Sequence, residues 1–415
     1  MNARVLEPPA PLDVARLRED FPILSRTVHG KPLIYFDNAN TSQKPLAVIE
    51  AVDRFYRETN ANVARSVHTL GEEATSAYEA TRDKLARFIN APSRDEIVFT
   101  SGTTQAINLV AYSFLMPRLL PGDEILVTTM EHHANIVPWQ ILGDRVGAKI
   151  KVAPINERGE LIVDRFVDLL TPSVKLAAVA HVSNVLGTIN PVAELARAAR
   201  KRGIPLLVDG SQALPHMPVD VRALGCDFYA LTGHKMFGPT GTGALWARKE
   251  ILRDMPPFFG GGEMIREVRF DGTTYADPPH RFEAGTPNIA GFVGLGAAID
   301  YIESIGRERI VAAERELLAY ATAALKSVPG LRLFGEAEHK AAVLSFLIDG
   351  VHAHDLATLL DHEGVAVRSG HHCAHPLMQF YKVPATVRAS LAFYNTREEV
   401  DRFIEAIGKV RKLLA

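Results

Sequence analysis

One lysine and one cysteine of this sequence stand among neighbours that suit covalent chemistry. Lys235 ends the segment Leu-Thr-Gly-His-Lys at 231–235, directly after an apolar run at 226–230. A lysine amine can form a Schiff base with a carbonyl compound when desolvation or nearby cations lower its pKa. Cys373 lies in Arg-Ser-Gly-His-His-Cys-Ala at 368–374, where histidines and an arginine favour the thiolate form. The two segments predict a carbonyl-binding lysine and a nucleophilic cysteine, although a lone lysine is more often a surface residue.

Two further segments supply what a lysine-bound aromatic cofactor would need. Asp209 follows the apolar run 205–208, at the strand end where ligands bind in open α/β sheets. A carboxylate there can keep a pyridinium nitrogen protonated, so that the ring acts as an electron sink; helix capping is the alternative role. The segment Thr-Ser-Gly-Thr-Thr at 100–104 also follows a strand and opens a helix. Backbone N–H groups at such a place can bind phosphate, although capping by Ser or Thr is their commoner use.

Paired histidines at 132–133 and 371–372 raise the question of a metal site. Adjacent helical residues do not face one another, and the first pair has no Glu or His at a spacing of four. The second group, three histidines and a cysteine within 371–375, is too tightly spaced for a tetrahedral zinc site without distant partners. We therefore expect no metal, and we interpret His132 as an imidazole that lies on an aromatic cofactor and passes protons.

The elements that must position these residues follow from the hydrophobic pattern. Short apolar runs with the composition of buried strands alternate with helical patterns; they lie at 96–99, 124–127, 149–152, 175–180, 205–208 and 226–230. This alternation predicts an α/β fold whose large domain holds a mostly parallel sheet. After residue 291, long helical stretches at 307–326 and 397–414 flank mixed strands and helices, which predicts a smaller α+β domain.

The expected domain organisation has three parts. Residues 1–25 form an N-terminal helical segment, which we place on the small domain although the sequence also allows the large one. Residues 26–292 form the large cofactor-binding domain. Residues 293–415 form the small C-terminal domain, which carries the catalytic cysteine.

The overall composition excludes several classes of protein. With 415 residues, of which 47% are hydrophobic and 23% charged, the chain can bury a large core. A net charge of -2 gives no reason to expect nucleic acid or an anionic membrane as a partner. No apolar run reaches the ~18 residues of a membrane-spanning helix, and residues 1–11 lack the apolar region of a secretory signal. Two cysteines make no disulfide framework, so we expect a cytoplasmic protein.

Taken together, the segments resemble the class V aminotransferase-like enzymes that use pyridoxal 5'-phosphate (PLP), and within them the SufS-type, or group II, cysteine desulfurases. The resemblance runs from about residue 22 to the C-terminus. It is most specific in Thr-Gly-His-Lys at 232–235, Arg-Phe-Glu-Ala-Gly-Thr-Pro-Asn at 281–288 and Arg-Ser-Gly-His-His-Cys-Ala at 368–374. It implies the aspartate aminotransferase-like fold of PLP-dependent transferases. It also implies conversion of L-cysteine to L-alanine, with the sulfur held as a persulfide on Cys373 for iron–sulfur cluster assembly.

The same resemblance implies roles for individual positions. Lys235, His132 and Cys373 would be catalytic, with Lys235 holding the cofactor and His132 stacked on its ring. The further cofactor contacts would be Asp209 at the ring nitrogen, Gln212 near the phenolic oxygen, and Thr103 or Thr104, Thr232 and His234 at the phosphate. In this family Thr286 would complete the phosphate site of the other subunit, so a homodimer is implied. The substrate carboxylate would be bound by Asn184 and Arg388, with Arg368 steering the substrate or the cysteine segment.

Some features depart from the family pattern or leave other reactions open. Thr232 replaces the usual serine and keeps its hydroxyl, whereas Ala64 stands where many relatives have histidine. Cys226 matches no functional position, and we expect a buried structural thiol. The alternatives are a selenocysteine lyase, another class V reaction of the transaminase or kynureninase type, and a non-catalytic sulfur carrier. A small sulfur-acceptor protein of the SufE or SufU kind is the expected partner.

Overall fold

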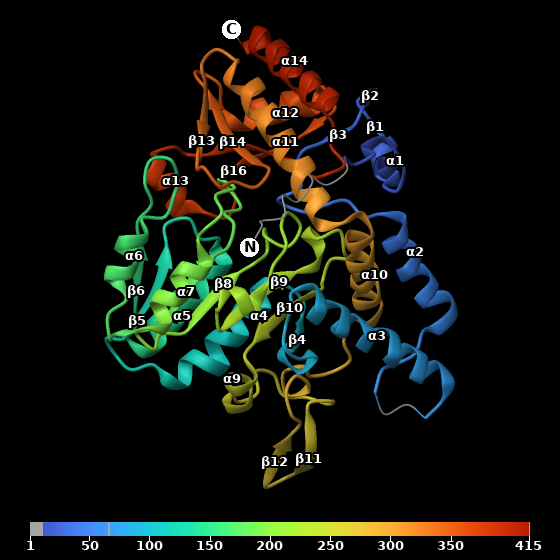
Figure 1. Cartoon of the computed structure of the whole chain (residues 1–415), viewed down its shortest axis with the longest axis vertical. Coiled ribbons are helices and arrows are strands. Elements are labelled where there is room, and N and C mark those ends of the chain that lie inside the picture. Colours follow the sequence, from blue (N-terminus) through green and yellow to red (C-terminus); the bar gives the residue numbers. More distant parts are fainter. Residues whose placement is uncertain (1–10, 65–66, 415) are drawn as a thin grey trace, which may run out of the picture.

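The computed structural model describes residues 11–64 and 67–414. A seven-stranded sheet with the order β4-β10-β9-β8-β7-β5-β6 forms the centre of its larger part (Figure 1). The strands are β4 (Ile97–Thr100), β5 (Glu124–Thr128), β6 (Lys149–Ala153), β7 (Val174–Ala180), β8 (Leu206–Asp209), β9 (Phe228–Thr232) and β10 (Gly243–Ala247). β10 runs antiparallel to both of its neighbours, and the other pairs are parallel. The predicted α/β class with a mostly parallel sheet is therefore confirmed.

Both faces of this sheet are buried, which explains why its strands read as continuous apolar runs. In β8, Leu206 and Val208 pack with helices of one layer, and Leu207 packs with helices of the other. The first layer contains α3 (Thr69–Phe88), α6 (Val163–Leu169), α7 (Val192–Arg200) and α10 (Ile289–Ile305). The second contains α4 (Thr103–Leu109), α5 (Val137–Val146) and α9 (Lys249–Asp254). Short α8 (Val221–Leu224) connects β8 to β9.

A second sheet, antiparallel throughout and in the order β13-β14-β17-β16, lies in the upper part of Figure 1. Its strands are β13 (Leu331–Phe334), β14 (Val343–Ile348), β16 (Arg368–Gly370) and β17 (Thr386–Ser390). It shares a core with α11 (Arg307–Lys326), α12 (Ala353–His362) and α14 (Arg397–Leu414). β15 (Val365–Ala366) pairs with β3 (Ile34–Tyr35), and α13 (His375–Tyr381) follows the cysteine segment.

The N-terminal part leads the chain along the small sheet towards the large one. It contains α1 (Val14–Glu19), β1 (Thr27–Val28), β2 (Lys31–Pro32) and α2 (Leu46–Arg54). Arg18 of α1 donates to the Tyr394 carbonyl at 2.6 Å and pairs with Glu399 of α14 at 2.9 Å. The first ten residues of the expected segment 1–25 lie outside the described residues. The expected division between 292 and 293 stays a prediction, and α10 spans it.

The sequence pattern missed several elements of the described chain, including one strand of the central sheet and one β-hairpin. β10 is fully buried, but it begins at a glycine and contains no β-branched residue, so it does not read as a strand. The hairpin of β11 (Ile265–Arg269) and β12 (Gly272–Tyr275) projects from the lower end of the molecule in Figure 1.

Over residues 11–64 and 67–414, no single helix is long and apolar enough to cross a membrane; α10 and α11 pass that test only as a pair bent by 75°.

Candidate active site

A cavity of about 420 Å³ opens where the carboxyl ends of the central parallel strands meet. Side chains that follow different strands converge on it, as expected for an open α/β sheet. The lining includes most of the cofactor residues predicted from the sequence: Thr103, Thr104, His132, Asp209, Gln212, Thr232, His234 and Lys235. Of the predicted substrate residues, Asn184 lines the same cavity.

Lys235 lies just after β9, in the short turn Gly233–Lys235, with its side chain partly exposed to the cavity. Within the described part of the chain its Nζ makes no hydrogen bond and no ion pair. Desolvation lowers the pKa of Lys235 to about 8, although the negative charge of Asp209 opposes the shift. About a tenth of the amine is therefore neutral and nucleophilic at pH 7, far more than for an ordinary lysine.

Asp209 is the last residue of β8 and is 7% exposed. Its Oδ1 accepts two hydrogen bonds from Ser211, at 2.9 Å from the backbone nitrogen and at 2.6 Å from the hydroxyl. The other oxygen, Oδ2, has no partner among residues 11–64 and 67–414. One carboxylate oxygen is thus fixed by the protein, and the other is left for a ligand in the cavity.

His132 precedes the short turn His133–Asn135, and its ring is oriented by the backbone. Its Nδ1 accepts a hydrogen bond from the Ala134 nitrogen at 3.0 Å, so the proton of the neutral ring sits on Nε2. Burial and the positive charge of Lys235 lower the pKa of His132 to about 4. The ring is therefore neutral at physiological pH, and Nε2 is its hydrogen-bond donor.

Glu131, which the sequence analysis did not single out, fixes the turn that carries His132. Its fully buried carboxylate accepts from the Thr128 hydroxyl at 2.5 Å, the Ala180 nitrogen at 3.0 Å and the Asn135 amide at 2.7 Å. Burial raises the pKa of Glu131 to about 7. These bonds tie the ends of β5 and β7 to the His132 turn.

Two arginines from the small sheet meet at one carboxylate beside the cavity. Arg388, in β17, is fully buried; it donates to the Asn184 carbonyl at 2.9 Å and to Asp37 at 3.2 Å. Arg368, in β16, donates to the same Asp37 at 3.2 Å. The buried Nε of Arg388 has no hydrogen-bond partner within the described residues. Asp37 was not predicted from the sequence; it holds both guanidinium groups in place.

Cys373 is exposed and lies in a segment held in an uncommon backbone conformation. His372 and Cys373 have φ angles of 52° and 55°, in the left-handed region that non-glycine residues seldom adopt. The Asn184 amide donates to the His372 carbonyl at 2.7 Å, and the His133 nitrogen donates to the Cys373 carbonyl at 2.7 Å. The His372 ring also bonds the Thr386 hydroxyl at 2.9 Å. These bonds fix the cysteine segment between the two sheets.

Thr286 is not brought into the cavity of its own chain. It lines a separate cavity of about 220 Å³ together with Ser101 and Gly241. Those two residues also line the larger active-site cavity, so the two hollows adjoin. Among residues 11–64 and 67–414 there is no group of three or more side chains that could hold a metal ion, and the expectation of no metal stays a prediction.

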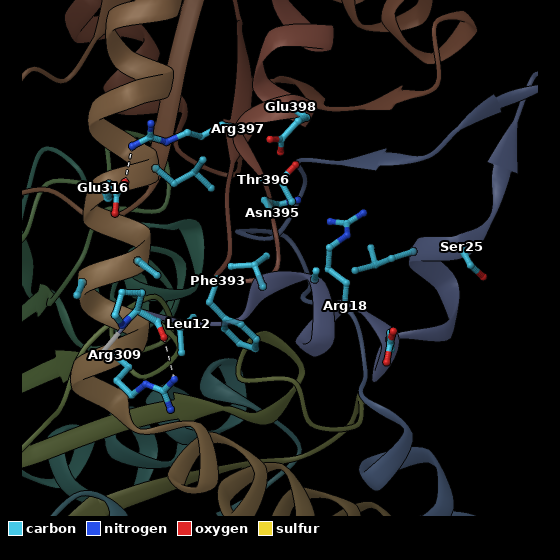
Figure 2. A pocket seen from close by; sticks show the side chains of 18 residues that line it. Leu12, Arg18, Ser25, Arg309, Glu316, Phe393, Asn395, Thr396, Arg397 and Glu398 are labelled. Carbon is cyan, nitrogen blue, oxygen red and sulfur yellow. Dashed lines mark hydrogen bonds and ion pairs between the residues drawn. The ribbon is translucent and has the colours of Figure 1, made fainter. Parts of the chain in front are cut away.

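A larger cavity of about 880 Å³ lies away from this site, between α1, α11 and the start of α14 (Figure 2). Its charged side chains are engaged with the protein: Arg397 pairs with Glu316, and Arg309 donates to the Pro11 carbonyl at 3.1 Å. Among the described residues that line it there is no cysteine, lysine or histidine. The chemistry-bearing residues therefore concentrate in the smaller cavity.

A buried histidine beside the site should make the stability of the protein depend on pH. His181 follows β7, and its Nδ1 lies 2.9 Å from the Tyr229 hydroxyl. Burial lowers the pKa of His181 to about 4 from an ordinary value of 6.5. Below pH 6.5 the unfolded chain binds a proton that the folded chain does not, so the free energy of unfolding falls as the pH falls towards 4. At pH 5 this histidine alone should cost about 2 kcal/mol.

The slope of the free energy of unfolding against pH reports how many protons the chain takes up on unfolding. We expect His181→Asn to lower this number by about one between pH 4 and 6.5. Urea unfolding at several pH values measures it, with exposed His339→Asn as the control. His132, His234 and His372 also have lowered pKa values, so the slope should be reduced rather than lost. An unchanged slope in His181→Asn would contradict the prediction.

Known proteins are similar to this chain over almost its full length. The model of the Aminotransferase class-V family matches residues 34–403. A "Probable cysteine desulfurase" of Xylella fastidiosa (strain 9a5c) is 66% identical over 407 residues, which are 98% of each chain. The solved structure of the cysteine desulfurase CsdA from Escherichia coli is 40% identical, with a TM-score of 0.91 over 98% of this chain and all of that one. A C-DES mutant with glycine covalently linked to its PLP cofactor has the same fold, with a TM-score of 0.82 at 23% identity, over 94% of this chain and 98% of that one.

Proposed function

Because this chain belongs to the cysteine desulfurases of the class V aminotransferase family, we propose that Lys235, Asp209 and Cys373 remove sulfur from L-cysteine with the help of PLP. The assignment of roles rests on one observation: two polar groups on the wall of the same cavity have no hydrogen-bond partner in the described chain. The Lys235 amine has no hydrogen-bond partner in the described chain, and neither has Oδ2 of Asp209. The clamped Cys373 segment lies beside them.

The residues around the cavity fit PLP. Its volume of about 420 Å³ lies in the range of small-molecule sites. Lys235 would hold the cofactor covalently, Asp209 would pair with the ring nitrogen, and His132 would lie on the ring. Hydroxyl and imidazole groups are available for the phosphate, and Gln212 has a buried amide oxygen without a partner in the described residues. When bound, PLP supplies an electron sink for charge that develops on the substrate.

The protein's own groups would bind the substrate and move its protons. Arg388 would take the substrate carboxylate with its guanidinium group, and Asn184 would support it. Lys235, with its pKa near 8, would remove the α-proton as a general base once the substrate has displaced it from the cofactor. His132 would exchange a proton through Nε2, the nitrogen that carries hydrogen in its neutral ring.

Cys373 would take the sulfur in a step that leaves alanine behind. Its thiolate attacks the substrate sulfur, so a new S–S bond forms as the C–S bond breaks. The electrons of the C–S bond stay with carbon, which gains a proton and becomes the methyl group of alanine. The sulfur remains on Cys373 as a persulfide. Within the group II, SufS-type enzymes, a small acceptor protein of the SufE or SufU kind would then collect it for iron–sulfur cluster assembly in the cytoplasm.

The experiment that tests this function is an assay of the purified, PLP-loaded protein with L-cysteine and a reductant. We expect alanine and sulfide in equal amounts, with slow turnover in the absence of an acceptor protein. Formation of a keto acid would favour transamination, and cleavage of kynurenine would favour the kynureninase-type reaction. Alanine from selenocysteine but not from cysteine would favour the lyase alternative. A protein that binds PLP but turns over neither amino acid would overturn the proposal.

A homodimer is part of the same proposal, because Thr286 lies outside the cofactor cavity of its own chain, next to its edge. We expect Thr286→Ala to weaken PLP binding about tenfold, by loss of a hydrogen bond to a charged group. The dissociation constant of PLP is measured by equilibrium dialysis, with Thr358→Ala on the exposed side of α12 as the control. A monomer in light scattering that retains full cofactor and full activity would refute the arrangement.

A further inference from the structure

Three consecutive oxygen atoms form a buried hydrogen-bonded chain next to the proposed ring-nitrogen site. The Ser211 hydroxyl lies 2.6 Å from Oδ1 of Asp209, and the Thr103 hydroxyl lies 2.7 Å from that of Ser211. Ser211 and Thr103 are 9% and 7% exposed. They come from separate elements, since Thr103 begins α4 and Ser211 follows β8. The fold thus brings two hydroxyl groups, 108 positions apart in sequence, behind a single carboxylate.

Proton counting gives this chain a direction. A carboxylate can only accept hydrogen bonds, so the Ser211 hydroxyl donates its single proton to Oδ1 of Asp209. The contact between Ser211 and Thr103 then needs a proton from Thr103. The Thr103 hydroxyl is therefore the donor at the start of the chain and has no second proton for another acceptor. The hydroxyl of Thr104, the next residue, is exposed to the cavity and makes no hydrogen bond within the described residues.

We propose that Ser211 and Thr103 are positioning residues for Asp209, and that Thr104 rather than Thr103 gives its hydroxyl to the phosphate of the cofactor. Hydrogen bonds donated to Oδ1 favour the charged carboxylate and fix its rotation about the side-chain bond. Oδ2 then faces the ring nitrogen as the negatively charged partner. Cooperative donation from Thr103 strengthens the bond from Ser211. This inference rests on the proposed PLP function and adds two residues that act on the ring only through Asp209.

The test uses PLP-loaded variants and two readouts, namely turnover of cysteine to alanine and the pH midpoint of the yellow absorbance band. Ser211→Ala removes the hydroxyl donor to Oδ1 and leaves the backbone donor in place. We expect turnover to fall about tenfold with KM for cysteine unchanged. The midpoint should move to higher pH. A ring nitrogen that is protonated less fully withdraws fewer electrons from the nitrogen of Lys235, which then keeps its proton to higher pH. Asp209→Ala gives the upper limit of both effects.

Thr103 is tested by an isosteric pair of variants. Thr103→Val should shift the midpoint in the same direction by a smaller amount, and Thr103→Ser, which keeps the hydroxyl, should restore the parent value. Because Thr103 acts through Ser211, the double variant Thr103→Val/Ser211→Ala should be no worse than Ser211→Ala alone. Ser113→Ala is the matched control, since its buried hydroxyl has no hydrogen-bond partner in the described chain.

The outcomes separate this inference from the function on which it rests. An unchanged midpoint in Ser211→Ala would overturn the proposal that Thr103 acts on Asp209 through Ser211. Losses of turnover that add in the double variant would overturn it as well. Weaker PLP binding in Thr103→Val, with an unchanged midpoint, would place Thr103 at the phosphate and overturn the assignment of Thr104. If Ser211→Ala fails to fold, the Thr103→Val and Thr103→Ser pair decides by the same criteria. A parent protein that never turns yellow with PLP would instead refute the proposed function, and the inference with it.

Discussion

Lys235→Ala is expected to lose the covalent bond to PLP and to lower alanine formation by about 10³-fold or more, the scale of a lost general base. The loss is large because the same amine would both hold the cofactor and remove the α-proton. The folded protein should persist, since the Lys235 side chain makes no hydrogen bond or ion pair in the described residues. Borohydride reduction of the yellow protein followed by peptide mapping identifies the attached lysine.

The structure explains why the bond should form at Lys235 and not at another lysine with an equally low pKa. Desolvation lowers the pKa of Lys44 to about 8 and that of Lys340 to about 7. However, Lys44 donates to the carbonyl oxygens of Ser42 and His234 at 2.5 and 2.8 Å, so its amine is engaged by the backbone.

Lys340 is engaged in the same way, since its amine lies 2.5 Å from the carbonyl oxygens of Leu186 and Gly335. A low pKa therefore does not select the reactive amine; freedom from partners does. Lys44→Ala is the matched control and should keep the covalent cofactor. A label on Lys44 or Lys340 instead of Lys235 would refute the assignment.

The parts of the site that the sequence predicts are those encoded by local segments. Lys235, Asp209 and His132 each follow a predicted strand, and parallel strands bring their carboxyl ends to one edge. That rule is enough to expect these side chains near one another. The alternation of apolar runs and helical patterns predicts the α/β class. The resemblance to a known family then gives each position a role.

The residues that the sequence does not predict act through contacts between distant segments. Asp37 lies 351 positions from Arg388 and 331 from Arg368, yet it holds both guanidinium groups. Glu131 accepts from the backbone of Ala180, 49 positions away. No local spacing signals such contacts, because they depend on how the small sheet packs on the large one. The short apolar strand β10 is missed for a different reason, namely its glycine and its lack of β-branched residues.

Cys373→Ser is expected to abolish the persulfide and to lower alanine formation from cysteine by about 10³-fold or more, because the serine hydroxyl is a poor nucleophile towards sulfur. PLP binding should be unchanged, since Cys373 does not line the cofactor cavity. Activity on selenocysteine should survive in part, because selenium leaves carbon more readily than sulfur does. The expected losses are thus specific to the sulfur-transfer step.

The second cysteine provides the matched control. Cys226 is fully buried, and burial raises the pKa of its thiol to about 12, so it holds almost no thiolate near neutral pH. Cys226→Ser should therefore leave persulfide formation unchanged. Mass spectrometry after brief exposure to cysteine without reductant should find one added sulfur on the Cys373 peptide. Sulfur on the Cys226 peptide alone, or alanine produced with no protein persulfide, would overturn the scheme.

The fixed backbone around Cys373 also predicts how the sulfur leaves. The carbonyl groups of His372 and Cys373 are held by Asn184 and His133, so the persulfide cannot swing far from the cavity. Cys373 is exposed at this place, and an acceptor must bring its own thiolate to it. We expect turnover to rise when a small acceptor protein with one reactive cysteine is added, and to stay low with an equal concentration of its Cys→Ser variant. Equal stimulation by both proteins would mean that the acceptor acts on the conformation of the enzyme and does not take the sulfur.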